Sequence, residues 1–153
     1  MIAKDNCDSK YSKYSKVIKK YYDKDKIILE TEYFLFNGKI ENQCKIYYVD
    51  GKIEKISNYI DNNLEGEFKT YHTNGNIYQT YNYKNNKKIG LYESYYDCGC
   101  LWIKYMCLND KIVGEFKTYY NDGVLESIRN FTDGKLDGEC RIYNHDGKIM
   151  RVC

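Results

Sequence analysis

The sequence predicts an all-β protein, an elongated and twisted antiparallel meander of repeated β-hairpins. Two observations carry this prediction: glycine recurs with a period of 24 residues, and β-type apolar and aromatic residues recur with the same period between the glycines. The composition agrees, because the 153 residues include 19 Tyr and no Pro. Aromatic and β-branched residues favour strands, and a fixed period is typical of a repeat architecture.

The glycines mark the places where the chain needs a positive φ. All 11 fall into three columns, whose members are separated by 24 residues or a multiple of it. Two turn positions in each period predict two chain reversals, and hence two strands per repeat. The columns are Gly51, Gly75, Gly99, Gly123 and Gly147; Gly66, Gly90, Gly114 and Gly138; and Gly38 with Gly134.

The residues around the glycines have the chemistry of hairpin turns. Asp-Gly and Asn-Gly between apolar stretches are the strongest local hairpin signal, and Asn and Asp also tolerate a left-handed backbone. The first column is preceded by Asp50, Asn74, Cys98, Asp122 and Asp146, and the third is completed by Asn62, Asn86 and Asp110.

The stretches between the turns are long enough for strands of about six to eight residues. Their apolar residues again occupy fixed columns, so we expect ladders of like side chains across the sheet. The columns are Cys44, Phe68, Tyr92, Phe116 and Cys140; Ile53, Ile77, Leu101, Leu125 and Ile149; Tyr59, Tyr83, Cys107 and Phe131; and Tyr47, Tyr71, Tyr95, Tyr119 and Tyr143.

A single repeat domain is expected over residues 16–153, preceded by an N-terminal cap or flexible segment, residues 1–15. Tyr21 and Tyr33 lie 50 residues before Tyr71 and Tyr83, which is two periods plus two residues. The first repeat is therefore interpreted as degenerate, with a second turn near Phe34 to Gly38 that is two residues longer. The expected repeats are 16–41, 42–65, 66–89, 90–113, 114–137 and 138–153.

Composition limits the classes of partner and compartment. The formal net charge is +2, so no strong field favours nucleic acid or an anionic membrane. The N-terminal stretch MIAKDNCDSK lacks the apolar core of a secretory signal, and no apolar run is long enough to span a bilayer. We therefore expect a soluble cytoplasmic protein, with its 7 cysteines reduced.

Segment Gly114–Leu125, GEFKTYYNDGVL, and segment Gly66–Gly75, GEFKTYHTNG, resemble the MORN-repeat proteins in their variant form. That form has the core Gly-x-Phe/Trp-x-x-Tyr-Tyr-x-Asn/Asp-Gly-x-Leu, and the resemblance covers about residues 38–153. The original MORN pattern carries a further His-Gly pair, where this chain has Asp137-Gly138.

The resemblance implies an elongated antiparallel sheet that serves as a scaffold for protein partners, self-association or membrane lipid. It implies no catalytic residues. Such proteins are found in large DNA viruses and AT-rich bacteria, where some are described as antitoxins, so a viral chain would lie in the host cytoplasm or virion.

No catalytic, cofactor or metal site is expected. His72 and His145 lie in different columns and different repeats, which favours surface roles over catalysis. Cys44, Cys107 and Cys140 replace Phe or Tyr and so resemble small buried hydrophobes. Cys98 and Cys100 lack the second ligand pair that a zinc site needs.

Two candidate contact surfaces follow from the residues. Trp102, Ile103 and Tyr105 in the third full repeat could form an aromatic interaction surface, although packing over the sheet is the simpler explanation. The last strand is a candidate for strand addition or for a homodimer seam, because a meander leaves its edges unpaired. Its apolar residues are Ile149, Met150 and Val152.

Charged residues alternate with the Phe/Cys column, so we expect them on the opposite, solvated face. They are Glu67/Lys69, Glu115/Lys117 and Glu139/Arg141.

The favoured function is a non-catalytic scaffold for a protein partner or for the chain itself. The alternatives are a toxin-neutralising protein and, less favoured, a membrane-surface adaptor.

Overall fold

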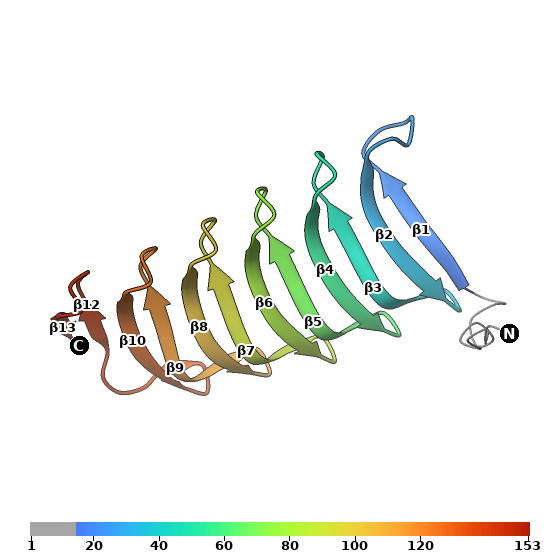
Figure 1. The fold of residues 1–153 in the computed structure, drawn as a ribbon. Helices are drawn as coiled ribbons and strands as arrows, with labels where there is room; N and C mark the ends of the chain where they lie inside the picture. Colours follow the sequence, from blue (N-terminus) through green and yellow to red (C-terminus); the bar gives the residue numbers. More distant parts are fainter. Residues whose placement is uncertain (1–14) are drawn as a thin grey trace, which may run out of the picture.

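The computed structural model describes residues 15–153 as one open antiparallel sheet, with its hairpins in series from β1 to β13 (Figure 1). Each strand pairs with its chain neighbours, except that β10 pairs with both β11 and β12, and no helix occurs in this range. The predicted all-β meander is confirmed. The strands are β1 (Ser15–Tyr21), β2 (Leu29–Phe36), β3 (Lys39–Tyr47), β4 (Ile53–Ile60), β5 (Asn63–Tyr71), β6 (Ile77–Lys84), β7 (Lys87–Tyr95), β8 (Leu101–Leu108), β9 (Lys111–Tyr119), β10 (Leu125–Thr132), β11 (Lys135–Leu136), β12 (Arg141–Tyr143) and β13 (Ile149–Val152).

The two predicted reversals per repeat are of different kinds and lie along opposite long edges of the sheet (Figure 1). One edge, here called the loop edge, carries longer loops such as 72–76, where the Gly75 amide donates to the His72 carbonyl at 2.8 Å. The other, here called the turn edge, carries two-residue turns such as Asn85-Asn86, whose φ angles are 49° and 64°. Positive φ at both positions is the type I′ geometry that matches the strand twist.

Three glycines of the second column, Gly66, Gly90 and Gly114, lie inside strands and form bulges, which the sequence did not reveal. Gly66 in β5 has a φ of 86°, and the pairing with β4 jumps from Ser57↔Phe68 to Tyr59↔Leu64. Equivalent shifts accompany Gly90 and Gly114. In the last repeat the same break separates β11 from β12. Bulges bend a strand and increase its twist, so this column shapes the whole sheet.

The prediction for the first repeat is wrong in one respect, because its two additional residues lie in the first loop and not near Phe34 to Gly38. The Asn37-Gly38 turn has ordinary two-residue geometry, with φ angles of 49° and 77°. The loop 22–28 is longer than 72–76, and the Asp23 carboxylate holds it by accepting the amides of Ile27 and Ile28 at 2.8 to 3.1 Å. Those bonds lower the pKa of Asp23.

The two faces of the sheet differ sharply. One face, here called the aromatic face, carries the cross-strand row Cys44, Ser57, Phe68, Tyr81, Tyr92, Tyr105, Phe116 and Arg129. By strand alternation, every buried residue of β3 to β10 lies on this face. The opposite face is called the charged face. The predicted burial of Cys44, Cys107 and Cys140 is confirmed at 7%, 5% and 4% exposure.

Stacked rings connect the repeats along the aromatic face. Centroid distances are 4.8 Å for Phe68 and Tyr81, 5.4 Å for Tyr81 and Tyr92, 4.5 Å for Tyr92 and Tyr105, and 5.3 Å for Tyr105 and Phe116. Fully buried Ser57 lies in the same row opposite Phe68, where its small side chain leaves room for that ring. Stacked pairs contribute beyond their buried area, so this row is the core of a sheet that has no second layer within residues 15–153.

Candidate protein-binding surfaces

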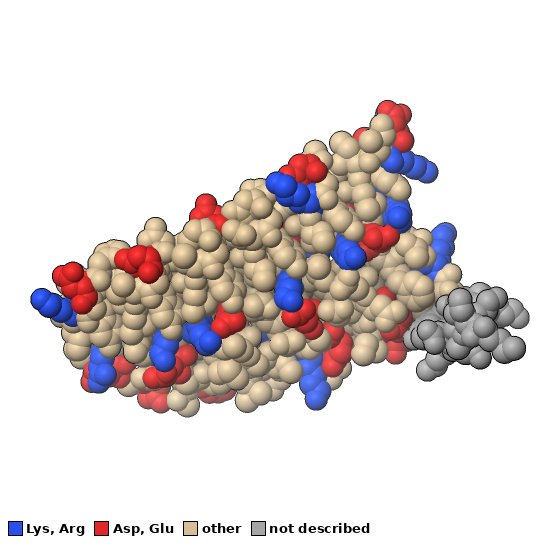
Figure 2. All heavy atoms as spheres, in the orientation of Figure 1, with Lys and Arg blue, Asp and Glu red and all other residues tan. Residues whose placement is uncertain are grey.

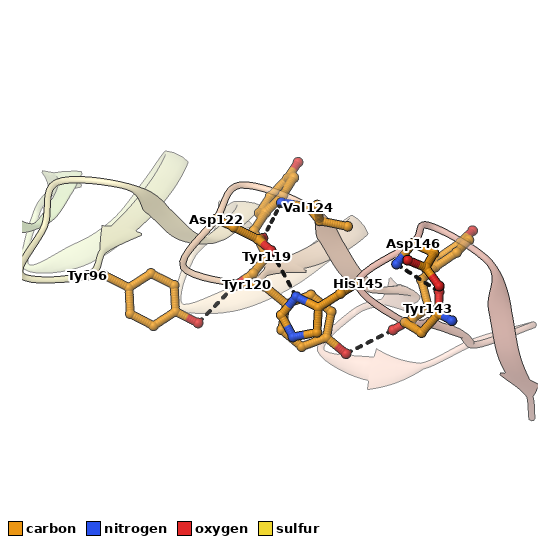
Figure 3. A network of polar contacts seen from close by, with 9 residues as sticks. Tyr96, Tyr119, Tyr120, Asp122, Val124, Tyr143, His145 and Asp146 are labelled. Atoms are coloured by element: carbon orange, nitrogen blue, oxygen red, sulfur yellow. Dashed lines mark hydrogen bonds and ion pairs between the residues drawn. The ribbon is translucent and has the colours of Figure 1, made fainter.

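The loop edge is held by a ladder of hydrogen bonds that runs from each repeat to the next (Figure 3). The residue that follows an odd-numbered strand donates to a main-chain carbonyl at the end of the equivalent strand in the next repeat, at 2.5 to 2.9 Å. The pairs are Tyr22 to Tyr47, Tyr48 to Tyr71, His72 to Tyr95, Tyr96 to Tyr119 and Tyr120 to Tyr143. These phenols therefore have a structural role.

Both histidines belong to this edge. His72 takes the place of a ladder tyrosine, and its Nε2 must carry the proton because the Tyr95 carbonyl only accepts. His145 stacks on Tyr120 with centroids 3.9 Å apart, and its Nδ1 lies 2.8 Å from an Asp122 carboxylate oxygen (Figure 3). That bond and the Val124 amide lower the pKa of Asp122, the amide having the larger effect. These surroundings agree with the expectation of surface roles.

The turn edge has a second ladder, made by the residues that complete the third glycine column. The Asn86 side chain accepts the Leu64 amide at 2.8 Å, and the Asn86 amide donates to the Leu64 carbonyl at 3.1 Å. Asn62 and Asp110 contact Ile40 and Lys88 in the same way. A turn residue thus pins the strand of the preceding repeat, so both long edges are used to hold the sheet together.

The cysteine pair in the third full repeat has a local structural role. In the equivalent loops an Asp or Asn oxygen accepts the amide two residues later, as Asp122 does from Val124 at 3.0 Å. Cys98 does the same through its sulfur, which lies 3.4 Å from the Cys100 amide nitrogen. The Cys98 side chain also raises the pKa of the Cys100 thiol. Within residues 15–153, no group of three or more His, Cys, Asp or Glu is placed to hold a metal ion.

The predicted solvated face is confirmed. Lys69 and Lys117 each pair with the glutamate two residues before, Glu67 and Glu115, at 2.7 Å, and Arg141 pairs with Glu139. The side shown in Figure 2 carries basic and acidic residues interspersed, without a large area of one sign. Exposed pairs of this kind are weak, so they keep the sheet solvated without defining a site.

Near the middle of the charged face, Glu93 has a more enclosed environment. Its carboxylate accepts from the Lys104 ammonium at 2.8 Å and from the Tyr95 hydroxyl at 2.9 Å. Burial alone would raise the pKa of Glu93, but these two bonds outweigh it and lower that pKa. The next residue in the cross-strand row is Lys117, which lies directly opposite Lys104. Two lysines therefore face each other across β8 and β9.

Beside these lysines, the third full repeat replaces polar residues by apolar ones. The cross-strand pair Leu91↔Met106 stands where the neighbouring repeats have Glu67↔Asn82 and Glu115↔Asn130. Leu91 is 38% exposed, and Met106 is 47% exposed. With their neighbours they form the apolar patch, defined as Ile89, Leu91, Met106, Leu108 and Val113.

A groove of about 550 Å³ runs over this part of the molecule. The groove is bounded by the apolar side chains of Leu91, Leu101, Met106, Val113 and Tyr119, and by Lys104, Glu115 and Lys117. Our sequence interpretation did not assign this surface. A comparison of the exposed columns of successive repeats would have found it. Positions 67, 91 and 115 hold Glu, Leu and Glu, and positions 82, 106 and 130 hold Asn, Met and Asn, so one repeat breaks both columns.

The three residues predicted as an aromatic surface do not lie together. Tyr105 is stacked between Tyr92 and Phe116 in the core row, and Ile103 shares the aromatic face. Trp102 is instead the additional residue at a register shift and packs on Tyr96, with centroids 5.5 Å apart. A contact role for Trp102, Ile103 and Tyr105 remains a prediction.

The other predicted surface, the last strand, lies at the end of the sheet. Among the described residues β13 pairs only with the three-residue β12, and the Cys153 amide and carbonyl bond to those of Cys140. Ile149, Met150 and Val152 are 55%, 68% and 54% exposed.

The expected segment 1–15 falls outside the described range except for Ser15, which begins β1. No helix in residues 15–153 is long and apolar enough to cross a membrane.

Comparison with known proteins identifies the kind of repeat in two segments of the chain. Residues 64–85 and 112–133 match the family described as MORN repeat variant, and no curated protein matches the chain. Each matched segment contains most of one hairpin, β5 with β6 or β9 with β10, including the loop between the strands. The matches begin 48 residues apart, which is two periods, and the unmatched hairpin between them has the same register and loops. These two segments are therefore MORN repeats in their variant form.

Proposed function

We propose that this chain is a non-catalytic repeat scaffold that binds a protein partner through the apolar patch. MORN repeats are non-enzymatic repeat modules, so function rests on surfaces rather than on reacting groups. The observation that carries the proposal is the Leu91↔Met106 pair, exposed where the repeats on both sides have Glu↔Asn pairs.

The repeats serve as internal controls for this argument. If the fold required apolar residues at these two positions, the neighbouring hairpins could not carry Glu67, Asn82, Glu115 and Asn130 there with the same backbone pairing. Packing in the sheet therefore does not explain the substitution. Exposed apolar residues that cluster within a polar face are typical of a protein interaction site.

Restoring the repeat pattern should separate binding from folding. We expect Leu91→Glu with Met106→Asn to leave the melting temperature nearly unchanged, because both side chains are substantially exposed. The same variant should lose a stoichiometric protein partner in affinity purification from the native cell lysate, followed by mass spectrometry. The loss follows because apolar contacts at the centre of an interface carry most of its binding energy.

A matched control is available in the preceding repeat. Glu67→Gln changes the position equivalent to Leu91 without altering the patch or the groove, so it should retain the partner. Equal capture by the wild type and by the Leu91→Glu, Met106→Asn variant would refute the role of the patch.

Self-association through β13 is a second candidate, favoured by the exposed Ile149, Met150 and Val152 on a strand that the described residues pair on one side. An unpaired edge can add a strand from a second copy about a two-fold axis. We expect deletion of residues 148–153 to convert a dimer into a monomer. Light scattering after size-exclusion chromatography measures this, and an unchanged mass for the truncated chain would dismiss the edge contact.

A further inference from the structure

We propose that the groove over the apolar patch binds an amphipathic α-helix of a partner protein, with the acidic flank of that helix against Lys104 and Lys117. This inference rests on the proposed function and names the kind of partner that the patch would take. Its supports are the hydrogen bonding of the sheet, the dimensions of the patch and the opposed lysines.

The backbone under the patch excludes strand addition at this place. The patch residues belong to β7, β8 and β9, and each of these strands is paired on both sides. An extended peptide lying over the patch would find no free backbone partners there, and its own amides and carbonyls would face apolar side chains at a cost. A helix satisfies its backbone internally, so it can bury apolar side chains on such a surface.

The patch also has the width of one helix. Three adjacent strands separated by about 4.8 Å extend roughly 10 Å across, and a helix with its side chains is about 10 Å in diameter. Leu91, Met106 and Val113 occupy adjacent positions on these strands, with Leu91 opposite Met106 and Met106 opposite Val113. A helix lying along these strands can contact all three with the side chains of one apolar face.

The opposed lysines set the charge of the helix. Lys104 and Lys117 both line the groove, and they lie directly opposite each other on β8 and β9. Like charges in opposite positions are unfavourable in a sheet. In the described parts of this row, every other basic residue faces an Ile, Val, Thr or Glu. Carboxylates on a bound helix would relieve the repulsion, in addition to the bonds that Glu93 and Glu115 already make.

A second copy of the chain fits this face less well. Two sheets packed face to face would also bury the ion pairs Glu67–Lys69 and Glu115–Lys117 that flank the patch. Burying such charges costs more than their mutual attraction commonly returns. A single helix covers the patch, leaves the Glu67–Lys69 pair in water and meets Lys117 with carboxylates of its own.

The test is a display selection with the whole chain as target, using random peptides long enough for about four helical turns. Clones that also bind the Leu91→Glu, Met106→Asn variant are removed by counter-selection. We expect the surviving sequences to have apolar residues three and four positions apart, with Asp or Glu on one flank. As synthetic peptides they should become helical on binding by circular dichroism, and Lys104→Gln with Lys117→Gln should weaken them about tenfold or more.

Several outcomes would overturn the inference. The selected peptides could bind as extended chains, carry basic flanks, or keep their affinity for the chain when both lysines are substituted. The selection could also return no peptide that depends on the patch. Finally, the wild-type chain could be a dimer that the Leu91→Glu, Met106→Asn variant dissociates. A native partner captured through Leu91 and Met106, combined with a failed selection, would overturn this inference and leave the proposed function standing.

Discussion

Replacing Tyr92 by alanine is expected to lower the free energy of unfolding by about 3 to 4 kcal/mol, the range typical of an aromatic residue removed from a core. Tyr92 is 8% exposed, and its ring lies 5.4 Å from that of Tyr81 and 4.5 Å from that of Tyr105. The substitution removes both stacking contacts and leaves a gap that this single-layered sheet can close only partly. Urea unfolding followed by far-ultraviolet circular dichroism measures the loss.

The position of Tyr92 increases the effect. Tyr81 belongs to β6 and Tyr92 to β7, so their contact joins two hairpins near the middle of the sheet. In a repeat protein, stability is approximately a sum of repeat terms and nearest-neighbour interface terms. A weakened central interface should therefore broaden the transition or split it into two, as the halves begin to unfold separately.

The control for this prediction is Tyr92→Phe, which keeps the ring and removes only the hydroxyl. We expect it to retain most of the stability and a single transition. Equal losses for the alanine and phenylalanine variants would contradict a stabilising role for the ring stack. A loss of less than about 1 kcal/mol for alanine would show that the row is not the core, because surface substitutions usually have effects of that size.

Much of the fold could be predicted because turn chemistry is local. Gly75, Asn85 and Asn86 take the positive φ angles that their residue types favour, and the period then repeats the same hairpin. The bulge column was harder to predict. Gly66 has the same positive φ as a turn glycine, at 86°, yet it lies within a paired strand, and only the register of the neighbouring strand shows this.

The candidate site was predicted less well, for a different physical reason. Tyr105 and Trp102 are neighbours in sequence, and aromatic residues are common both in cores and at interfaces. The alternation of the strand and a register shift send Tyr105 into the ring stack and Trp102 to the loop that contains Tyr96. Leu91 and Met106 are less conspicuous in sequence, and become a surface only when β7 and β8 pair them.

The aromatic row should also make the fold sensitive to alkali. Burial is the main cause that raises the pKa of Tyr81, Tyr92 and Tyr105 in the folded chain. An unfolded tyrosine ionises near pH 10. Because the folded pKa lies above the unfolded one, this contribution to stability is fully present below about pH 10 and is lost as the pH rises through the folded pKa.

We therefore expect cooperative unfolding above about pH 10, since a phenolate cannot stay in the ring stack. Each tyrosine that ionises only on unfolding removes up to about 1.4 kcal/mol per pH unit, and less where the ring edge is exposed. The three tyrosines together can thus overcome the stability of a small domain within one or two pH units. Tyrosinate absorbance and far-ultraviolet circular dichroism should change together in a titration of the intact chain.

Tyr105→Phe is the matched control, because it keeps a ring between Tyr92 and Phe116 and removes one group that must ionise. Its alkaline transition should move to higher pH and lose steepness, while its stability to urea at neutral pH changes little. Gradual tyrosinate formation with an unchanged dichroism spectrum would mean that the stacked hydroxyls already reach water. The row would then have to stabilise the sheet through its ring contacts alone, with no contribution from excluding the charged phenolate.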